Sequence, residues 1–139
     1  MTIEQAKKKA LELIKKSKTC VLATVDKNGF PNMRAMMNLK NDGLQTIWFS
    51  TNFSSIKIAQ IKKNKKGGVY FFDEKMFKGL RLIGEIKIKT DKASREKLWH
   101  PGFEIYYPKG VNDPDYCVLE LKIKAGNYYQ GFEKADFKI

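Results

Sequence analysis

Two glycine-containing turns divide the segment from Thr19 to Ser50 into three short runs of apolar and β-branched residues. The pairs Asn28-Gly29 and Asp42-Gly43 are typical of tight hairpin turns. Connections this short join antiparallel neighbours, because a parallel pair needs a crossover of a dozen residues or more. The sequence therefore predicts consecutive antiparallel strands, the second and third lying side by side. These strands cover Thr19–Val25, Phe30–Leu39 and Leu44–Ser50.

Short helices and longer strands are predicted in the rest of the chain. Apolar residues at helical spacing, with a capping box from Thr2 to Gln5, predict a helix from Thr2 to Lys16. A second helix is predicted over residues 54–66, ended by Gly67-Gly68, and a third is capped by Asp91. Further strands are predicted at Val69–Asp73, at Leu80–Thr90 with a bulge or close backbone approach at Gly84, and over residues 116–132 as one strand or two.

These elements predict a mainly β domain of α+β character. Six or seven antiparallel strands would form a small barrel, accompanied by two or three short helices. The length of 139 residues is enough for one hydrophobic core, and no linker or internal repeat divides it. Residues 1–139 are therefore expected to form a single domain.

Composition restricts the partners and the compartment. The net charge of +12 is compatible with a nucleic-acid partner, but only three of the 27 basic residues are arginines, which base readout favours. Nucleic acid is therefore not the favoured partner. The apolar runs are too short to span a membrane, and the first residues do not have the pattern of a secretory signal. Cys20 and Cys117 are expected to be buried thiols of a cytoplasmic protein.

Side chains that could carry out chemistry alone are scarce. His100 is the only histidine, so a metal site built on paired histidines is not expected, and the cysteines do not have metal-ligand spacing. A nucleophilic pair of Cys117 and His100 is conceivable, but a surface turn is the plainer interpretation of His100. No phosphate-binding glycine-rich motif or GxSxG is present. Any reaction is therefore expected to depend on a cofactor.

The stretch FSTNFSSIK, residues 49–57, has two interpretations. It is typical of a turn with a helix cap, but its hydroxyls, helix amides and lysine would also suit an anion. Arg34 lies in an otherwise apolar strand and needs either an anion or an acidic partner such as Glu85. The predicted pairing of the second and third strands would bring Arg34 near Thr51, Ser55 and Lys57.

The order of these segments resembles that of the pyridoxamine-phosphate-oxidase-like family of FMN-binding split barrels, most closely its small general-stress-protein-like branch. The segments are CVLATVDKNGFPNMRAM, WFSTN followed by SxK, LIGEIKI, and LWHPGFEIYYPKGVNDPDYCVLELKI. The resemblance implies a split barrel and a cytoplasmic, stress-related homodimer with FMN at the subunit interface. It also implies flavin hydride or electron transfer on an unknown small molecule, with a nicotinamide as a candidate substrate.

The resemblance also implies the residues that bind FMN. Arg34 would contact the phosphate or the flavin edge, and Ala35, Met36 and Met37 would pass beneath the isoalloxazine. Phe49, Ser50 and Thr51 would line the ribityl chain and phosphate, while Ser55 and Lys57 would complete the anion site. Trp48 is expected in the barrel core, and no residue is assigned a catalytic role.

Departures from the family pattern argue against vitamin B6 oxidation. Ile56 stands where the oxidases have an arginine, Lys78-Gly79 replaces an Arg-Gln pair, and the C-terminal residues that bind substrate phosphate have no counterpart before Ile139. A lower FMN affinity is also expected.

Two other hypotheses remain open at this point. Phe53, Phe77, Tyr106 and Tyr107 are expected to be exposed and would allow single-stranded nucleic acid to stack on a basic barrel. Related split barrels bind haem or a deazaflavin, and His100 would then be the candidate axial ligand for a haem.

Overall fold

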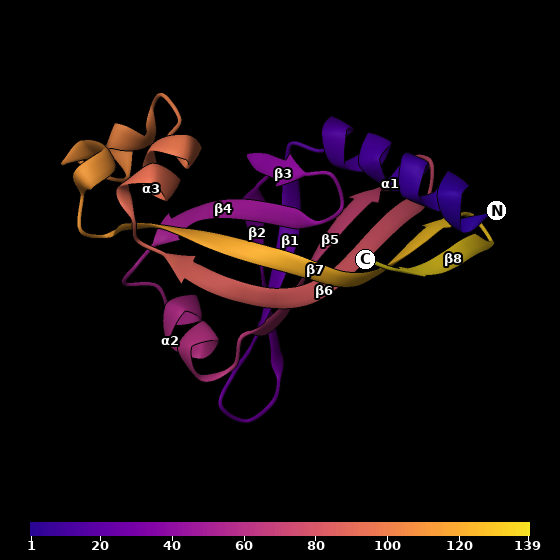
Figure 1. The fold of residues 1–139 in the computed structure, drawn as a ribbon, viewed down its shortest axis with the longest axis horizontal. Coiled ribbons are helices and arrows are strands. Elements are labelled where there is room, and N and C mark those ends of the chain that lie inside the picture. Colours follow the sequence, from indigo (N-terminus) through magenta and orange to yellow (C-terminus); the bar gives the residue numbers. More distant parts are fainter.

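Antiparallel strands make up most of the computed structural model, which describes all 139 residues (Figure 1). The eight strands are β1 (Thr19–Val25), β2 (Pro31–Met37), β3 (Lys40–Asp42), β4 (Thr46–Asn52), β5 (Lys66–Asp73), β6 (Lys78–Lys89), β7 (Tyr116–Gln130) and β8 (Glu133–Lys138). The helices are α1 (Ile3–Lys16), α2 (Ile56–Lys63) and α3 (Lys92–Leu98), and two 3₁₀ turns, η1 (Phe103–Ile105) and η2 (Gly110–Asn112), follow α3.

The strands form one curled sheet in the order β2-β1-β5-β6-β7-β4-β3, and β8 pairs with β7. The long strands β6 and β7 lie at its centre, and the sheet curls around a core of 22 buried residues. The predicted mainly β, antiparallel barrel-like fold with short helices is therefore confirmed. The strand number is eight rather than six or seven, because the short strands β3 and β8 add to the predicted set.

The predicted pairing of the second and third strands is wrong. The strand β2 pairs with β1 alone, whereas β4 pairs with β3 and β7. The reason lies in the connection after β2, where the Asn38 side chain donates hydrogen bonds to the carbonyls of Ile14 and Ser17, both at 2.8 Å. The chain is thus held at the end of α1, and residues 40–42 form the hairpin with β4 instead.

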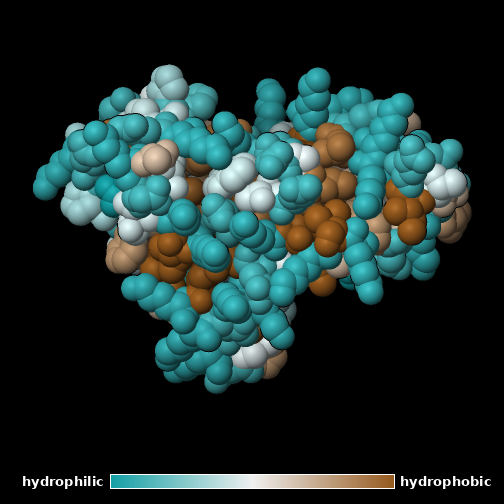
Figure 2. Space-filling model, viewed as in Figure 1, coloured by the Kyte–Doolittle hydropathy of each residue, from teal (hydrophilic) through white to brown (hydrophobic).

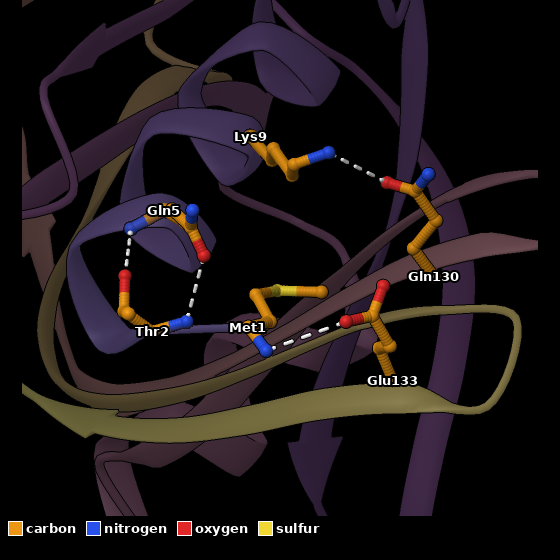
Figure 3. Close-up of polar contacts among 6 residues, drawn as sticks. All are labelled: Met1, Thr2, Gln5, Lys9, Gln130 and Glu133. Atoms are coloured by element: carbon orange, nitrogen blue, oxygen red, sulfur yellow. Dashed lines mark hydrogen bonds and ion pairs between the residues drawn. The ribbon is translucent and has the colours of Figure 1, made fainter.

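The helix α1 begins with the predicted capping box. The Thr2 hydroxyl accepts from the Gln5 amide at 3.1 Å, and the Gln5 side chain accepts from the Thr2 amide at 2.9 Å (Figure 3). The buried face of α1, which includes Ala6 and Ala10, packs on the strands at the end of the core. Lys9 donates to Gln130 at 3.2 Å, so the first helix is fastened to the turn between β7 and β8 (Figure 3).

Two glycines predicted to end α2 belong instead to β5. The helix ends at Lys63, and Gly67 and Gly68 pair with β6. A Cβ atom on Gly67 would lie 2.8 Å from the Ala23 carbonyl oxygen, so this glycine permits close approach of the neighbouring strand. The predicted irregularity at Gly84 is confirmed, since the register of β6 against β7 shifts between Ile83 and Gly84.

A second, smaller core lies where α3, η1 and η2 cover the ends of β4 and β7, at the left of Figure 1. Its five buried residues are Leu98, Phe103, Tyr107, Tyr116 and Val118, and Trp48 and Trp99 pack against them. On the face drawn in Figure 2, hydrophobic side chains form small separate patches among hydrophilic ones. None of the helices has both the length and the apolar character that a membrane span requires.

Candidate functional site

A cavity of about 310 Å³ lies between β2, the end of β4, the first turn of α2 and the η1 segment. Six of the nine residues predicted to bind a cofactor line it: Ala35, Met36, Met37, Ser50, Thr51 and Lys57. Five further residues complete the lining: Leu39, Asn52, Phe103, Tyr106 and Tyr107. The folded chain thus brings β2 and the end of β4 to one cavity, although these strands do not pair with each other.

Lys57 provides the only charge in the lining of this cavity. Its ammonium group donates to the hydroxyl of Ser55 at 3.2 Å, and Ser55 is the N-cap residue of α2. Burial, and then repulsion from Arg34, lower the pKa of Lys57. Neither Lys57 nor Arg34 takes part in any of the six ion pairs of the structure. The positive charges of Lys57 and Arg34 are therefore not neutralised by an ion pair.

Arg34 is held beside the cavity by neutral oxygen atoms. Its guanidinium donates to the Thr24 hydroxyl at 2.7 Å and to the Asn32 carbonyl at 3.0 Å. The Thr24 hydroxyl in turn donates to the buried side chain of Gln60 on α2, and Gln60 donates to the Asn32 side chain at 3.2 Å. This network joins β1, β2 and α2 and fixes the position of Arg34. Thr24, Asn32 and Gln60 were not predicted as site residues, although a glutamine on the buried face of a short helix was an available signal.

The proposed ion pair between Arg34 and Glu85 is wrong. Glu85 pairs with Lys65 at 3.6 Å and with Lys124 at 3.2 Å. These cations lower the pKa of Glu85, chiefly through the hydrogen bond from Lys124. Arg34 therefore lacks the acidic partner that would have made it a purely structural residue.

Of the three predicted residues of β4, Ser50 and Thr51 line the cavity and Phe49 does not. Ile47, Phe49 and Thr51 point toward the main core, and Phe49 is completely buried there. Phe49 therefore does not line the cavity, whereas Thr51, at the end of the strand, does. Trp48 points to the other side, where it is half-buried against the smaller core and carries the Lys97 ammonium 3.8 Å from its ring centroid.

One wall of the cavity is aromatic, which the sequence analysis did not predict. Phe103 and Tyr107 are buried, and they support the exposed ring of Tyr106 at centroid distances of 6.5 and 6.4 Å. Burial raises the pKa of Tyr107 to about 12, so its hydroxyl stays protonated and donates to Asn52 at 3.4 Å. The density of aromatic residues in FEIYY was the available signal.

The remaining titratable candidates lie outside this cavity. His100 is exposed, and its Nδ1 atom lies 3.0 Å from the Pro101 carbonyl oxygen. Burial raises the pKa of Cys20 to about 12 and that of Cys117 to about 11, so both thiols remain protonated at neutral pH. A protonated, buried Cys117 does not make a nucleophilic pair with His100. No group of three or more His, Cys, Asp or Glu side chains is placed to hold a metal ion.

The aromatic residues considered for nucleic-acid stacking differ in their exposure. Phe53 follows β4, Phe77 precedes β6 and Tyr106 follows η1. Tyr107, which was expected to be exposed, is buried against Tyr116 and Trp99 in the smaller core. Three of the four rings are therefore exposed as expected, and Tyr107 is not.

The family description "Pyridoxamine 5'-phosphate oxidase like" matches residues 5–138. The chain belongs to this family. A characterised member, the pyridoxine/pyridoxamine 5'-phosphate oxidase of Agrobacterium fabrum, is 40% identical over 73 residues. These residues are 52% of this chain and only 35% of that oxidase. The chain therefore matches about a third of the length of the oxidase.

Among solved structures, this family member is similar to a protein related to a general stress protein. A protein from Clostridium acetobutylicum related to general stress protein 26, of the pyridoxinephosphate oxidase family, superposes with a TM-score of 0.89. It is 45% identical, over 99% of this chain and 97% of that one, in agreement with the predicted resemblance. A heme binding protein from Mycobacterium smegmatis shares the fold at a TM-score of 0.77 and 12% identity, over 96% of this chain and 57% of that one.

Proposed function

We propose that this protein binds FMN in the cavity beside β2 and uses it for hydride or electron transfer on a small molecule. The observation that carries the proposal is the unbalanced pair of cations: Lys57 lines the cavity, and Arg34 lies close enough to add to the lowering of the Lys57 pKa that burial causes. Charges removed from water require a counterion, and a phosphate group is a strong one. FMN provides a phosphate on a molecule that also carries a flat ring.

The donor set at the Lys57 end fits a phosphate. Lys57 and Ser55 offer an ammonium and a hydroxyl, and Thr51 offers a second hydroxyl at the edge of the cavity. The Ser55 side chain makes no hydrogen bond to the helix it precedes, so the first amides of α2 lack that partner. Free amides at a helix start favour anions through both hydrogen bonding and the helix dipole.

The other end of the cavity suits a flat apolar ring. Met36, Met37 and Leu39 offer adaptable apolar surface, and the aromatic residues Phe103 and Tyr107, from the smaller core against which Leu39 packs, line the same cavity. FMN, when bound, supplies the redox chemistry. The residues of the chain would hold its phosphate, orient the ring against Ala35–Met37 and keep water from one side.

We propose a homodimer because the cavity is small and β2 is uncovered. A volume of about 310 Å³ lies at the lower end of the range for ligand pockets, about 300–1,000 Å³. Beside it, Met33 and Met37 are 67% and 49% exposed, and a further hollow of about 600 Å³ includes Met33 and Ile83 in its walls. A second copy covering this face would complete each FMN site, so dimerisation and FMN binding would be linked.

Two uses of the flavin fit this site. One is nicotinamide-driven reduction of a small molecule, and the other is flavin binding without turnover in a stress response, as similarity to a protein related to general stress protein 26 suggests. Vitamin B6 oxidation is not proposed, because the oxidase match covers only 35% of that enzyme. Buried free thiols at Cys20 and Cys117 favour the reducing cytoplasm as the location. FMN is favoured over haem, since His100 lies outside the cavity.

The test compares FMN with riboflavin, which lacks the phosphate, in wild type and Lys57→Ala. Loss of a charge-assisted contact to the phosphate should cost about 1.5–3 kcal/mol, a rise in the FMN dissociation constant of about ten- to a hundredfold. Riboflavin binding should change little. The dissociation constants are measured by flavin fluorescence at fixed salt.

The matched control is Lys63→Ala, which removes an exposed lysine from the last turn of the same helix. It should leave both ligands unaffected. Equal losses for FMN and riboflavin in Lys57→Ala would mean that Lys57 supports the fold or the ring rather than the phosphate. Folded wild-type protein that binds no FMN at low salt would overturn the proposed function.

A further inference from the structure

The carboxylate of Asp115 holds the loop between β4 and α2, which delivers Ser55 and Lys57 to the cavity. One oxygen accepts from the Ser54 amide at 2.8 Å, and the other accepts from the Ser54 hydroxyl and the Asn52 side chain, both at 3.1 Å. The Asp115 backbone carbonyl also accepts from the Phe53 amide at 2.7 Å. The last residue of β4 and the first two loop residues, Asn52, Phe53 and Ser54, are therefore bound to this one aspartate.

Asp115 is itself held by a second aspartate. Its amide donates at 2.9 Å to the side chain of Asp113, and the other Asp113 oxygen accepts from the Lys109 amide at 3.1 Å. Asp113 is only 7% exposed and lies beside the smaller core, so it does not move freely. The support runs from this rigid connection, through Asp115, to the loop and then to the first turn of α2.

We infer that Asp115 is a positioning residue for the anion site: it fixes residues 52–55 so that Ser55 and Lys57 face the cavity before a ligand arrives. The inference rests on the proposed function, in which this end of the cavity takes the FMN phosphate. A loop already held in its bound conformation loses less freedom on binding, which increases affinity. Asp115 does not line the cavity, so it acts through the loop.

The charge of Asp115 and its hydrogen bonds to the loop have opposite expected effects on FMN binding. A carboxylate near a phosphate site repels the ligand, so its charge alone opposes binding. Asp115→Asn removes that repulsion but places an amide group opposite the donors of Asn52 and Ser54. If charge dominated, this variant would bind FMN more tightly than wild type. If positioning dominates, as we infer, the variant binds FMN more weakly.

The experiment measures FMN and riboflavin dissociation constants for wild type, Asp115→Asn and the control Asp136→Asn. Asp136 is an exposed carboxylate on β8, 3.9 Å from Arg81 in an ion pair. We expect the FMN dissociation constant of Asp115→Asn to rise about tenfold, with riboflavin nearly unchanged, and the control to match wild type. Tighter FMN binding, no change, or equal losses for the two flavins would each overturn the inference.

A second measurement separates this inference from the proposed function. Amide hydrogen exchange at Phe53 and Ser54 should become faster in Asp115→Asn without any flavin present, while exchange in β6 and β7 stays the same. Unchanged exchange at these two amides overturns the inference even if FMN binds. If Asp115→Asn does not fold, Ser54→Ala serves instead, because it removes only the hydroxyl bond and should raise the FMN dissociation constant by about two- to threefold. Wild-type protein that does not bind FMN contradicts the proposed function alone.

Discussion

Arg34 donates all of its hydrogen bonds to neutral oxygen atoms, so its charge remains available to a ligand. Arg34→Gln keeps an amide donor for Thr24 but removes the charge. We expect the free energy of unfolding to change by less than about 1 kcal/mol, because no ion pair is broken. FMN affinity should fall about tenfold, through the lost attraction to the phosphate.

Thermal unfolding and flavin titration of the same samples check this prediction. Lys63→Gln is the matched control, because Lys63 is an exposed cation in the last turn of α2 and takes part in none of the six ion pairs. A large loss of stability in Arg34→Gln, with equal effects on FMN and riboflavin, would show that Arg34 serves the network with Thr24 rather than a ligand.

The sequence predicted some of the residues that line the cavity and missed others. Ala35–Met37 and Lys57, which the family resemblance assigned to one site, do line one cavity, although the expected pairing of β2 with β4 is absent. Phe49 was assigned to the ligand, but β alternation turns it into the core. Tyr106 and its supports were missed, because the connection around them depends on turns at Gly102 and Gly110 with positive φ, and it has no periodic pattern.

At the scale of elements, β6 depends on one position without a side chain. A Cβ atom on Gly84 would lie 1.9 Å from the Lys122 carbonyl oxygen and 3.0 Å from the Ile123 Cα atom. The obstacle is backbone, which cannot move without breaking the β6–β7 pairing. We therefore expect Gly84→Ala to lower the free energy of unfolding by about 3 kcal/mol or more, as overpacking and lost ladder bonds combine.

Chemical denaturation measures the effect, with Gly131→Ala as the comparison. Gly131 lies in an exposed turn at a φ of 60°, where nothing stands within 4 Å of a Cβ atom, so only the backbone preference is lost. Its cost should be about 1 kcal/mol. A loss for Gly84→Ala no larger than this would mean that the bulge can shift register to accept a methyl group.

Local sequence signals predicted individual helices and strands, but they did not predict which strands pair across the chain. The capping box set the start of α1, and β-branched residues with an Asn-Gly turn set β1. The predicted pairing of β2 with β1 is confirmed, but its predicted pairing with β4 is wrong. The Asn38 side chain holds the chain at α1, and a sequence window contains no sign of that contact. Gly67-Gly68 was predicted to end α2, but these glycines lie in β5. Gly67 is needed there because the neighbouring strand β1 approaches closely, which is also a contact across the chain that a sequence window does not contain.

At the scale of the whole molecule, the uncovered face of β2 and β6 determines the expected assembly. Met33 pairs in register with Ala23, Ala23 with Gly68, and Gly68 with Ile83, so exposed Met33 and Ile83 flank a shallow apolar row. We predict a homodimer through this face. Met33→Lys would place a charge in the interface and should shift the protein to monomers at micromolar concentration, with weaker FMN binding.

Sedimentation velocity, with and without FMN, measures the assembly. The matched control is Ile3→Lys, which changes an apolar residue that is 53% exposed on α1, away from this face. It should leave the dimer intact. A wild-type monomer in the presence of FMN, or the same behaviour in both variants, would contradict the prediction.

The contact between α1 and the turn from β7 to β8 also bears on how the protein is made. Lys9 and Gln130, which bond to each other, are 121 positions apart in sequence. At about 5–20 residues per second, a ribosome needs roughly 6–24 s to synthesise the chain between them. During that interval α1 is present without the complete β7 and β8, which cover part of its buried face. Rare codons late in the message would lengthen this exposure, and a chaperone that shields amphipathic helices would have its main opportunity then.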